Sequence, residues 1–504
     1  MSKALTIVGT NSSAGKSFLV SALGRYFVNK GFKVAPFKAQ NMSLQSFVCR
    51  DGGEIGLAQA LQALACKLEP ESIFNPILLK PEGRRKSQVL LRGKYYKTLT
   101  AEDYYKEKEN LWSHLKEILD DLNNRYDILL LEGAGSPAEI NLLEADLVNI
   151  KPAIYLQSPV IIVGDIDKGG VFASLYGTVE LLKKFCPDYA ELIKGFIINK
   201  FRGALKILKP GIKKLHKLTG LPTLGVLPYL SDFHLSEEDG FSFFSKASIY
   251  KRLSRECIKI VVLALKHISN FSDFDPFYLE EEVELLYSLR KEDILSADII
   301  IIPGSKNTFS DLKLLHQMEI SKTLKEAKNR GAEIIGICGG FQMLGKILKN
   351  PYKLEAPIKE MKGLGLLEVE TFFYPEKITS QVYAEPLATS MENLNLPLWG
   401  YEIHKGVTYG DLNLFKIKRL ASGEILIDGK KEGNVWGTYL HGLFTNDQFR
   451  GHLLNNHRQK KDLPTITNPP SYWNTIDKSF NILANFIETS LNMKKIYKLL
   501  KIDT

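Results

Sequence analysis

Residues 9–17 have the composition of a loop that binds nucleotide phosphates. They read Gly-Thr-Asn-Ser-Ser-Ala-Gly-Lys-Ser and stand between an apolar run at 5–8 and a helical pattern at 18–30. The backbone N–H groups of such a loop, and the N-terminus of the helix after it, attract phosphate oxygens. We expect Lys16 to neutralise the β and γ phosphates and Ser17 to place its hydroxyl on Mg²⁺. The predicted ATP-binding residues of the loop are Gly9, Thr10, Asn11, Gly15, Lys16 and Ser17.

The spacing of this loop departs from the common pattern, because five residues rather than four separate Gly9 from Gly15. An ordinary Gly/Ser turn is the alternative interpretation. Two charged residues at other predicted strand ends support the nucleotide site. Glu132 follows the apolar run at 128–131, where a carboxylate suits Mg²⁺ coordination, although a solvated turn acid would fit as well. Lys38 follows the run at 33–36, where it would stabilise phosphoryl oxygens or else be a surface lysine.

Cys338 lies at a predicted strand-to-helix turn. Residues 336–340 read Gly-Ile-Cys-Gly-Gly, after a strand pattern at 333–337 and before a helical pattern at 341–346. Small neighbours permit the strained elbow that exposes a nucleophile, and the helix N-terminus lowers the thiol pKa. A buried core cysteine is the alternative.

A thiol nucleophile needs a general base and an oxyanion site. Of the nine histidines, His441 is best placed, because it comes directly after a strand pattern at 435–439. The turn at 302–307 would donate a backbone N–H at Gly304, opposite that of Gly339, although an ordinary Pro-Gly turn is equally compatible. The sequence thus predicts a thiol hydrolase site with Cys338 and His441.

The elements that must position these residues are short runs of Ile, Val and Leu, each followed by a Gly-rich or acidic turn and a longer amphipathic stretch. This pattern is typical of βαβ units with buried parallel strands. We predict an α/β protein with two such units in succession. The expected strands are 5–8, 33–36, 128–131, 160–163 and 195–198 in the first half, and 258–265, 299–302, 333–337 and 435–439 in the second.

Composition sets broader limits. The chain has 504 residues, 44% hydrophobic and 24% charged, which is close to an average globular protein and excludes a disordered or fibrous class. The net charge of +9 is too small to indicate nucleic acid. Five scattered cysteines without a C-x-x-C pair argue against a disulfide framework and a zinc site, so we expect a reducing, cytoplasmic setting. No apolar run is long enough to span a membrane.

The predicted domains are 1–235, a linker at 236–256, 257–450 and a helical tail at 451–504. The tail carries helical patterns at 480–487 and 496–500 and ends in lysines. We expect it to pack onto the second domain, with binding to a membrane surface as the alternative.

Each half of the chain resembles a known family. Its second half is similar to the class I glutamine amidotransferases of cobalamin synthesis, and its first half to the dethiobiotin synthetase-like ATPases, whose loops also carry the extra residue. The strings APFKAQNMSLQS, DGGEIGLAQALQA, EGAGSPAEINL, GDIDKGGVFASLYG, INKFRG, LGVLPYL, PGSKNT and GYEIHKG jointly resemble the cobyric acid synthase family, from residue 5 to about residue 449.

The resemblance implies two doubly wound domains, a P-loop NTPase and a flavodoxin-like amidotransferase. It implies that ATP and Mg²⁺ activate a corrinoid carboxylate as an acyl phosphate, and that ammonia freed from glutamine converts it to an amide. Four carboxylates of adenosylcobyrinic acid a,c-diamide are amidated in turn in that family. By motif, Cys338 is the nucleophile and His441 its base, while the loop, Lys38 and Glu132 form the ATP site.

Three features stay open. Gln40, Asn41 and Asp165 are candidates for corrin binding, although an acid at the end of 160–163 would equally cap the next helix. Most class I enzymes have a glutamate two residues after the histidine, but here the residue is Leu443, so the group that orients His441 is unidentified. Glu402 and His404 have no assigned role, and His404 would be a substrate contact or merely structural.

Two alternatives compete with this function. A sister amidotransferase would act on the a and c carboxylates or on a cell-wall glutamate, but NMSLQS and EIGLAQALQA fit the cobyric acid type better. An ATP-driven partitioning or scaffold protein would carry an inactive amidotransferase domain, and it would have no need of Cys338 and His441.

Overall fold

The computed structural model describes residues 3–82, 86–230, 256–387 and 397–503. They form two compact units. The first comprises Met1–Ser43, Glu54–Leu235 and Ile476–Thr504, and the second comprises Leu44–Gly53 and Ser236–Thr475. The linker predicted at 236–256 lies, up to residue 255, outside the described residues. None of the described helices is long and apolar enough to cross a lipid bilayer.

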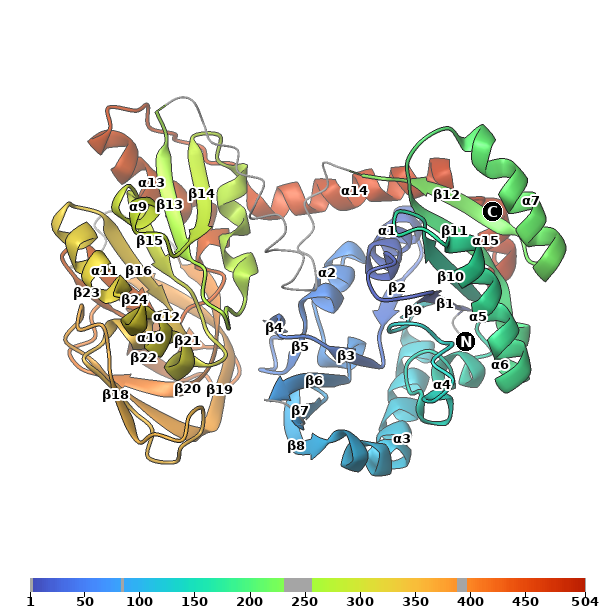
Figure 1. Cartoon of the computed structure of the whole chain (residues 1–504), viewed down its shortest axis with the longest axis horizontal. Coiled ribbons are helices and arrows are strands. Elements are labelled where there is room, and N and C mark those ends of the chain that lie inside the picture. The colour runs from blue at the N-terminus through green and yellow to red at the C-terminus, as the bar shows by residue number, and fades with distance from the viewer. Residues whose placement is uncertain (1–2, 83–85, 231–255, 388–396, 504) are drawn as a thin grey trace. The chain divides into compact units, whose positions relative to one another are not determined.

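The first unit is built on a six-stranded parallel sheet with the order β12-β11-β10-β1-β9-β2 (Figure 1). Leu129 and Leu131 pack with α3 in one core cluster, and Val160 and Ile162 pack with α5 in another. Helices therefore cover both faces of the sheet, which is why its strands are continuous apolar runs. The strands are β1 (Lys3–Gly9), β2 (Val34–Phe37), β9 (Ile128–Glu132), β10 (Val160–Asp165), β11 (Ile193–Phe201) and β12 (Thr223–Pro228). The helices are α1 (Lys16–Asn29), α2 (Leu57–Ala65), α3 (Ala101–Arg125), α4 (Lys151–Tyr155), α5 (Val171–Phe185), α6 (Pro187–Leu192) and α7 (Leu205–Thr219), with the short 3₁₀ helices η1 (Ser72–Phe74) and η2 (Leu143–Ala145).

A smaller four-stranded sheet, β3-β6-β7-β8, belongs to the same unit. Its strands are β3 (Gln40–Met42), β6 (Ile77–Glu82), β7 (Lys86–Leu91) and β8 (Lys94–Thr100). β3 runs parallel to β6, whereas β6, β7 and β8 are antiparallel to one another. This sheet carries the predicted substrate residues Gln40 and Asn41 on its first strand.

The second unit contains a sheet with the order β14-β13-β15-β16-β24-β23, parallel except for the edge strand β23 (Figure 1). Its strands are β13 (Ile258–Leu263), β14 (Val283–Ser288), β15 (Ile299–Ile302), β16 (Glu333–Ile337), β23 (Lys430–Glu432) and β24 (Val435–Thr438). A second sheet has the order β18-β17-β19-β21-β22, with β20 paired to β19. Its strands are β17 (Ile347–Lys349), β18 (Glu360–Lys362), β19 (Glu370–Pro386), β20 (Leu398–Tyr409), β21 (Phe415–Arg419) and β22 (Ile425–Asp428). The short strand β4 (Ser46–Val48) also belongs to the second unit, whereas the short strand β5 (Glu54–Gly56) belongs to the first.

The helices of the second unit are α9 (Lys291–Leu295), α10 (Thr308–Gln317), α11 (Ile320–Asn329), α12 (Gly339–Leu344), α13 (Asp447–Lys460) and the 3₁₀ helices η3 (Phe271–Leu279) and η4 (Leu443–Thr445). All nine strands expected from the sequence are present, with shifts of a few residues at their ends. The predicted fold class, two α/β domains, is confirmed.

The C-terminal tail departs from its prediction. Helix α14 (Tyr472–Ser490) begins in the second unit, but from Ile476 onward it and α15 (Met493–Leu500) belong to the first. Arg25 on α1 is fully buried, pairs with Asp477 at 2.7 Å and lies over the ring of Phe480. The ring of Tyr497 on α15 packs edge-on against Tyr26 on α1. The expected packing of these helices on the second domain is therefore wrong, because a buried arginine on α1 requires an acid that the tail provides.

Candidate active sites

Cys338 stands at the turn between β16 and α12 with φ of 51°, a left-handed conformation that residues with a Cβ rarely adopt. A Cβ added to Gly340 would overlap the carbonyl of Ile302, so glycine is required two residues after the cysteine. The thiol is nearly buried, and its sulfur lies 3.8 Å from the carbonyl oxygen of Ile403. The elbow expected from the sequence thus places a strained, enclosed thiol at the carboxyl end of the sheet.

His441 follows β24 and is held by Asp273, a residue that the sequence did not single out. Asp273 Oδ2 lies 2.6 Å from His441 Nδ1, and Oδ1 accepts a hydrogen bond from the Gly442 N–H at 3.0 Å. Burial alone would lower the pKa of His441, but the charges of Asp273 and Cys338 and the hydrogen bond with Asp273 raise it to about 10. The carboxylate of Asp273 therefore favours the charged form of the imidazole.

The sequence left the group that orients His441 unidentified, and in the structure Asp273 occupies that position. It lies on η3, 168 residues before the histidine. The only local sign is an acid set in the aromatic run Phe-Ser-Asp-Phe-Asp-Pro-Phe, and that run contains two aspartates. Nothing in the pattern distinguishes Asp273 from Asp275.

Both predicted oxyanion glycines lie beside the elbow. A Cβ on Gly304 would come within 3.0 Å of His441 Cε1, and a Cβ on Gly339 within 2.9 Å of the Ser305 nitrogen. The turn after β15 therefore packs closely on His441, and the start of α12 packs closely on Ser305.

Glu355 adds a carboxylate near the same place. Its Oε2 accepts a hydrogen bond from the Thr308 N–H at 2.8 Å, and a Cβ on Gly339 would lie 3.4 Å from the Thr308 hydroxyl. Burial raises the pKa of Glu355 to about 7, although Lys405 and Lys306 act in the opposite direction. Glu355 is thus linked to the elbow through Thr308 and is influenced by the charges of Lys405 and Lys306.

Glu402 and His404 form a structural cluster. Arg419 donates to both carboxylate oxygens of Glu402, at 2.7 and 3.1 Å, and His404 Nε2 lies 3.3 Å from it. His404 Nδ1 lies 2.6 Å from the Gly406 carbonyl oxygen, and its ring stacks on Tyr439 at 3.7 Å. Burial would raise the pKa of Glu402, but His404 and Arg419 hold it at about 2. Because both ring nitrogens contact the protein, the structural interpretation of His404 is favoured over a substrate contact.

The phosphate loop of the first unit connects β1 and α1. Gly15 has φ of 98°, and Lys16 Nζ donates to the carbonyl oxygens of Asn11 and Gly135 at 3.0 and 3.3 Å. A Cβ on Gly9 would lie 2.9 Å from the Asn11 carbonyl oxygen. Thr10 completes the turn, with its N–H donating to the Val163 carbonyl at 2.9 Å.

Two side chains from the end of β11 hold the outer part of this loop. Asn199 Nδ2 donates to the Ala14 carbonyl at 2.9 Å, and Lys200 Nζ donates to the Ser13 carbonyl at 2.8 Å. Lys200 also pairs with Asp165 at 2.9 Å. The predicted substrate residue Asp165 is thus joined through Lys200 to the loop.

Glu132 is the centre of the predicted metal site. Its Oε1 accepts hydrogen bonds from Ser17 Oγ at 2.7 Å and Lys38 Nζ at 2.9 Å, and Gln62 donates to Oε2. Glu132 and Lys38 are both buried. The neighbouring strands β1, β9 and β2 end at the same edge, which brings Ser17, Glu132 and Lys38 together. A carboxylate and a hydroxyl are oxygen donors that fit Mg²⁺.

Gln40 and Asn41 lie on β3, away from the strand that carries Asp165. Gln40 Oε1 accepts a hydrogen bond from the Tyr104 hydroxyl, and Asn41 Nδ2 donates to Gln59 Oε1 at 2.8 Å. β3 belongs to the small sheet, whereas β10 lies inside the six-stranded sheet. The three candidates for corrin binding are therefore divided between two sheets.

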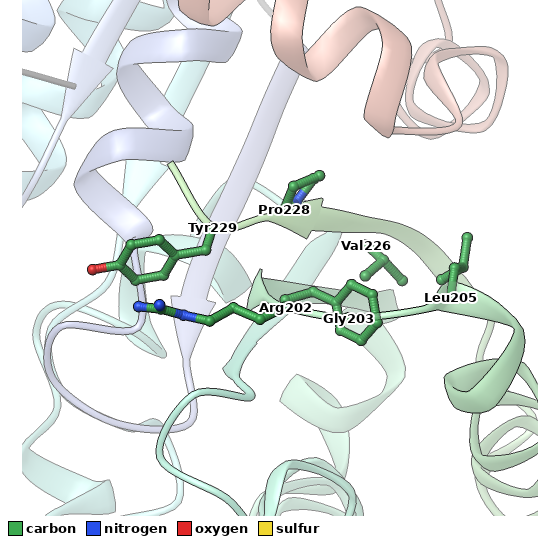
Figure 2. A pocket seen from close by; sticks show the side chains of 7 residues that line it. Arg202, Gly203, Leu205, Val226, Pro228 and Tyr229 are labelled. Carbon is green, nitrogen blue, oxygen red and sulfur yellow. The ribbon is translucent and has the colours of Figure 1, made fainter. Parts of the chain in front are cut away.

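A cavity of about 540 Å³ opens beside the ends of β11 and β12, and Figure 2 shows its lining. The Arg202 guanidinium lies 3.6 Å from the centre of the Tyr229 ring, and Arg202 Nε is 3.3 Å from Asp167 Oδ1. The cavity is lined by Phe201, Arg202, Gly203, Leu205, Val226, Pro228 and Tyr229. Lys200, the residue before Phe201 in the chain, reaches the phosphate loop with its side chain.

Comparisons with known proteins identify the same two kinds of domain. A family model described as a CobB/CobQ-like glutamine amidotransferase domain matches residues 259–449, and one described as a CobQ/CobB/MinD/ParA nucleotide binding domain matches residues 5–243. A cobyric acid synthase of Thermodesulfovibrio yellowstonii is 55% identical over 503 residues, which cover 99% of each chain. One from Caldanaerobacter subterraneus subsp. tengcongensis is 43% identical over 511 residues, again covering 99% of each. The chain is therefore a member of the cobyric acid synthase family, with a nucleotide-binding domain followed by a glutamine amidotransferase domain.

Proposed function

We propose that this enzyme is a carbon–nitrogen ligase that amidates corrinoid carboxylates with ATP and glutamine. Its substrate would be adenosylcobyrinic acid a,c-diamide, four carboxylates of which become amides. The observation that carries the proposal is the Cys338 elbow with its Asp273–His441 pair, in a chain that also has the phosphate loop. The relatives named cobyric acid synthase support the choice of substrate over that of a sister amidotransferase.

In the amidotransferase unit, the Cys338 thiolate attacks the side-chain amide carbon of glutamine. The N–H groups at Gly304 and Gly339 are proposed to stabilise the oxyanion. His441 donates its proton to the leaving nitrogen, the carbon–nitrogen bond breaks and ammonia departs, leaving a thioester. His441 then takes a proton from water, which attacks the thioester to release glutamate and the thiolate. Asp273 keeps the imidazole in place through both proton transfers.

Glutamine also needs a site for its charged α-amino and α-carboxylate groups. Glu355 is linked to the elbow through Thr308, whose N–H it accepts and whose hydroxyl lies beside Gly339. Its carboxylate would accept the α-ammonium, and Lys306 or Lys405 would pair with the α-carboxylate. This arrangement matches the zwitterion of a free amino acid.

In the nucleotide unit, Lys16 and the loop N–H groups bind the ATP phosphates. Ser17 and Glu132 are the residues that would hold Mg²⁺, which neutralises phosphate charge when bound. Lys38 faces the same carboxylate and would stabilise the transferred phosphoryl group. A corrinoid carboxylate oxygen attacks the γ phosphorus and ADP leaves. Ammonia then attacks the acyl phosphate, and the amide and inorganic phosphate are the products.

The cavity beside Arg202 and Tyr229 is proposed to hold the nucleoside part of ATP. It has about 540 Å³ of space, which lies within the range of small-molecule sites. A flat guanidinium over an aromatic ring offers a surface on which a purine can stack.

Mass spectrometry of a corrinoid diamide incubated with the enzyme, ATP, Mg²⁺ and glutamine tests the function. Each conversion replaces a hydroxyl by an amino group, and four successive small mass losses are expected. A sister enzyme for the a and c positions would leave the diamide unchanged but would amidate cobyrinic acid. A partitioning ATPase would hydrolyse ATP and alter neither corrinoid.

A further inference from the structure

The segment Leu44–Gly53 belongs to the amidotransferase unit, although the chain on both sides of it belongs to the nucleotide unit. Its strand β4 is buried, with Val48 completely covered. A tight turn closes the segment, because the Cys49 N–H donates to the Gly53 carbonyl at 2.7 Å. A Cβ on Gly52 would lie 3.0 Å from the Thr379 carbonyl oxygen, so this turn sits closely against β19.

Phe47 of this segment lies behind the ring that supports the catalytic histidine. The rings of Tyr401 and His441 stack at 5.3 Å with an interplanar angle of 17°, and the two residues exchange backbone hydrogen bonds of 2.9 and 3.1 Å. Phe47 packs on Tyr401 at 6.2 Å and stacks on Trp399 at 6.0 Å. The Tyr401 hydroxyl accepts a hydrogen bond from Asn270 Nδ2 at 3.2 Å, which fixes the far end of that ring.

Val48 packs against Ile403, the residue whose carbonyl oxygen lies beside the Cys338 thiol. It forms an apolar cluster with Tyr401 and Ile403, and the Ile403 carbonyl oxygen is 3.8 Å from Cys338 Sγ. Gln381 Nε2 donates to the Val48 carbonyl at 2.9 Å and anchors the segment. Two consecutive residues of the segment therefore support the two residues of β20 that contact His441 and Cys338.

We propose that Phe47, acting through Tyr401, is a positioning residue for His441, so that glutamine hydrolysis requires a segment supplied from within the nucleotide-binding half of the chain. The proposal rests on the proposed function, in which His441 serves Cys338. The described part of the chain places these groups near the imidazole: Asp273 from η3, Cys338 from the elbow, the Tyr401 ring from β20 and the Gly304 turn. Phe47 touches the third of these and carries no charge, so its effect is geometric.

Removing the Phe47 ring frees Tyr401 to tilt, and His441 then leaves its alignment with Asp273 and the thiol. Small misalignments of catalytic groups are costly, and a loss on the order of tenfold in glutamine-dependent kcat is expected for Phe47→Ala. Because the pair with Asp273 raises the pKa of His441, weaker pairing lowers that pKa. The alkaline limb of kcat/KM for glutamine should therefore move to lower pH.

The experiment measures amide formation by the full-length enzyme with glutamine and with ammonia, across pH. In Phe47→Ala, glutamine-dependent kcat should fall and the alkaline limb should shift, while ammonia-dependent activity stays within about twofold of wild type. Phe47→Tyr, which keeps the ring, should restore both. Tyr409→Ala is the matched control, because Tyr409 is an aromatic residue on the same β20 strand that packs on Phe372 instead.

Glutamine-dependent kcat and pH profile unchanged in Phe47→Ala would overturn the inference. Equal losses with glutamine and ammonia would also overturn it, since they would indicate a general packing defect. Failure of the proposed function looks different: wild-type enzyme would then form no amide from glutamine, or would keep doing so without Cys338.

Discussion

Asp273 Oδ2 lies 2.6 Å from His441 Nδ1, and the two residues are joined across 168 positions of the chain. Leu443 occupies the position at which most class I amidotransferases have the glutamate that orients the histidine, so the orienting carboxylate in this chain comes from a different element. The Gly442 N–H donates to the other oxygen of Asp273 and so restricts the orientation of the carboxylate. Both carboxylate oxygens of Asp273 thus contact the segment that carries His441.

Asp273→Asn should reduce glutamine-dependent kcat/KM by on the order of 100-fold, because the amide neither compensates the charge of the imidazolium nor fixes the tautomer of the neutral imidazole. Since Asp273 raises the pKa of His441, the variant lowers that pKa, and the alkaline limb of the profile should move well below its wild-type position. Ammonia-dependent activity should persist. Asp275→Asn, in the same 3₁₀ helix, is the control, and an equal loss there would contradict the role given to Asp273.

Cys338→Ala should abolish amide formation from glutamine and leave ammonia-dependent formation intact, because only the first requires the thioester. Parallel assays with the two nitrogen donors check this. Cys186→Ala, which changes a half-buried cysteine of the first unit, should behave as wild type. If added ammonia does not rescue the Cys338 variant, the assignment of ammonia release to the amidotransferase unit and of amide synthesis to the nucleotide unit is wrong.

Lys16→Ala should remove activity with both nitrogen donors, since the acyl phosphate forms before ammonia is used. Glutamine hydrolysis can be followed separately as glutamate release. Lys30→Ala provides the comparison, because Lys30 lies at the far end of α1, where it forms an exposed pair with Glu488. Retained ammonia-dependent turnover in Lys16→Ala would exclude the phosphate loop as the ATP site.

Glu355→Gln should raise KM for glutamine by about tenfold, because the amide cannot pair with the α-ammonium. Burial raises the pKa of the Glu355 carboxyl to about 7, so it is protonated below that pH and charged above it. In the wild type, KM for glutamine should therefore rise as the pH falls through about 7, and the variant should lose this dependence. Glu360→Gln, at an exposed position of β18, should keep the wild-type profile.

Much of the molecule follows from local sequence. The runs at 128–131 and 160–163 are apolar throughout because both faces of a parallel sheet are covered, and that pattern is readable without the structure. Residues 9–17 and 336–340 are also local, because a tight turn between a strand and a helix needs its glycines at neighbouring positions. The phosphate loop, the cysteine elbow and the two α/β units were therefore predicted from the sequence.

Contacts between distant segments were not predictable in this way. Asp273, Asn199 and Phe47 carry no local pattern that indicates what they touch. The tail was assigned to the wrong unit because an amphipathic helix shows that it needs an apolar partner but not which one. In the structure the tail buries Phe480, Leu483 and Ile487 within the first unit, and Asp477 pairs there with Arg25. By itself, the sequence indicated which residues are candidates for catalysis, since spacing along the chain is local information. Only the tertiary structure decided which acid orients His441 and which segment supports it, because those choices depend on packing between elements far apart in the chain.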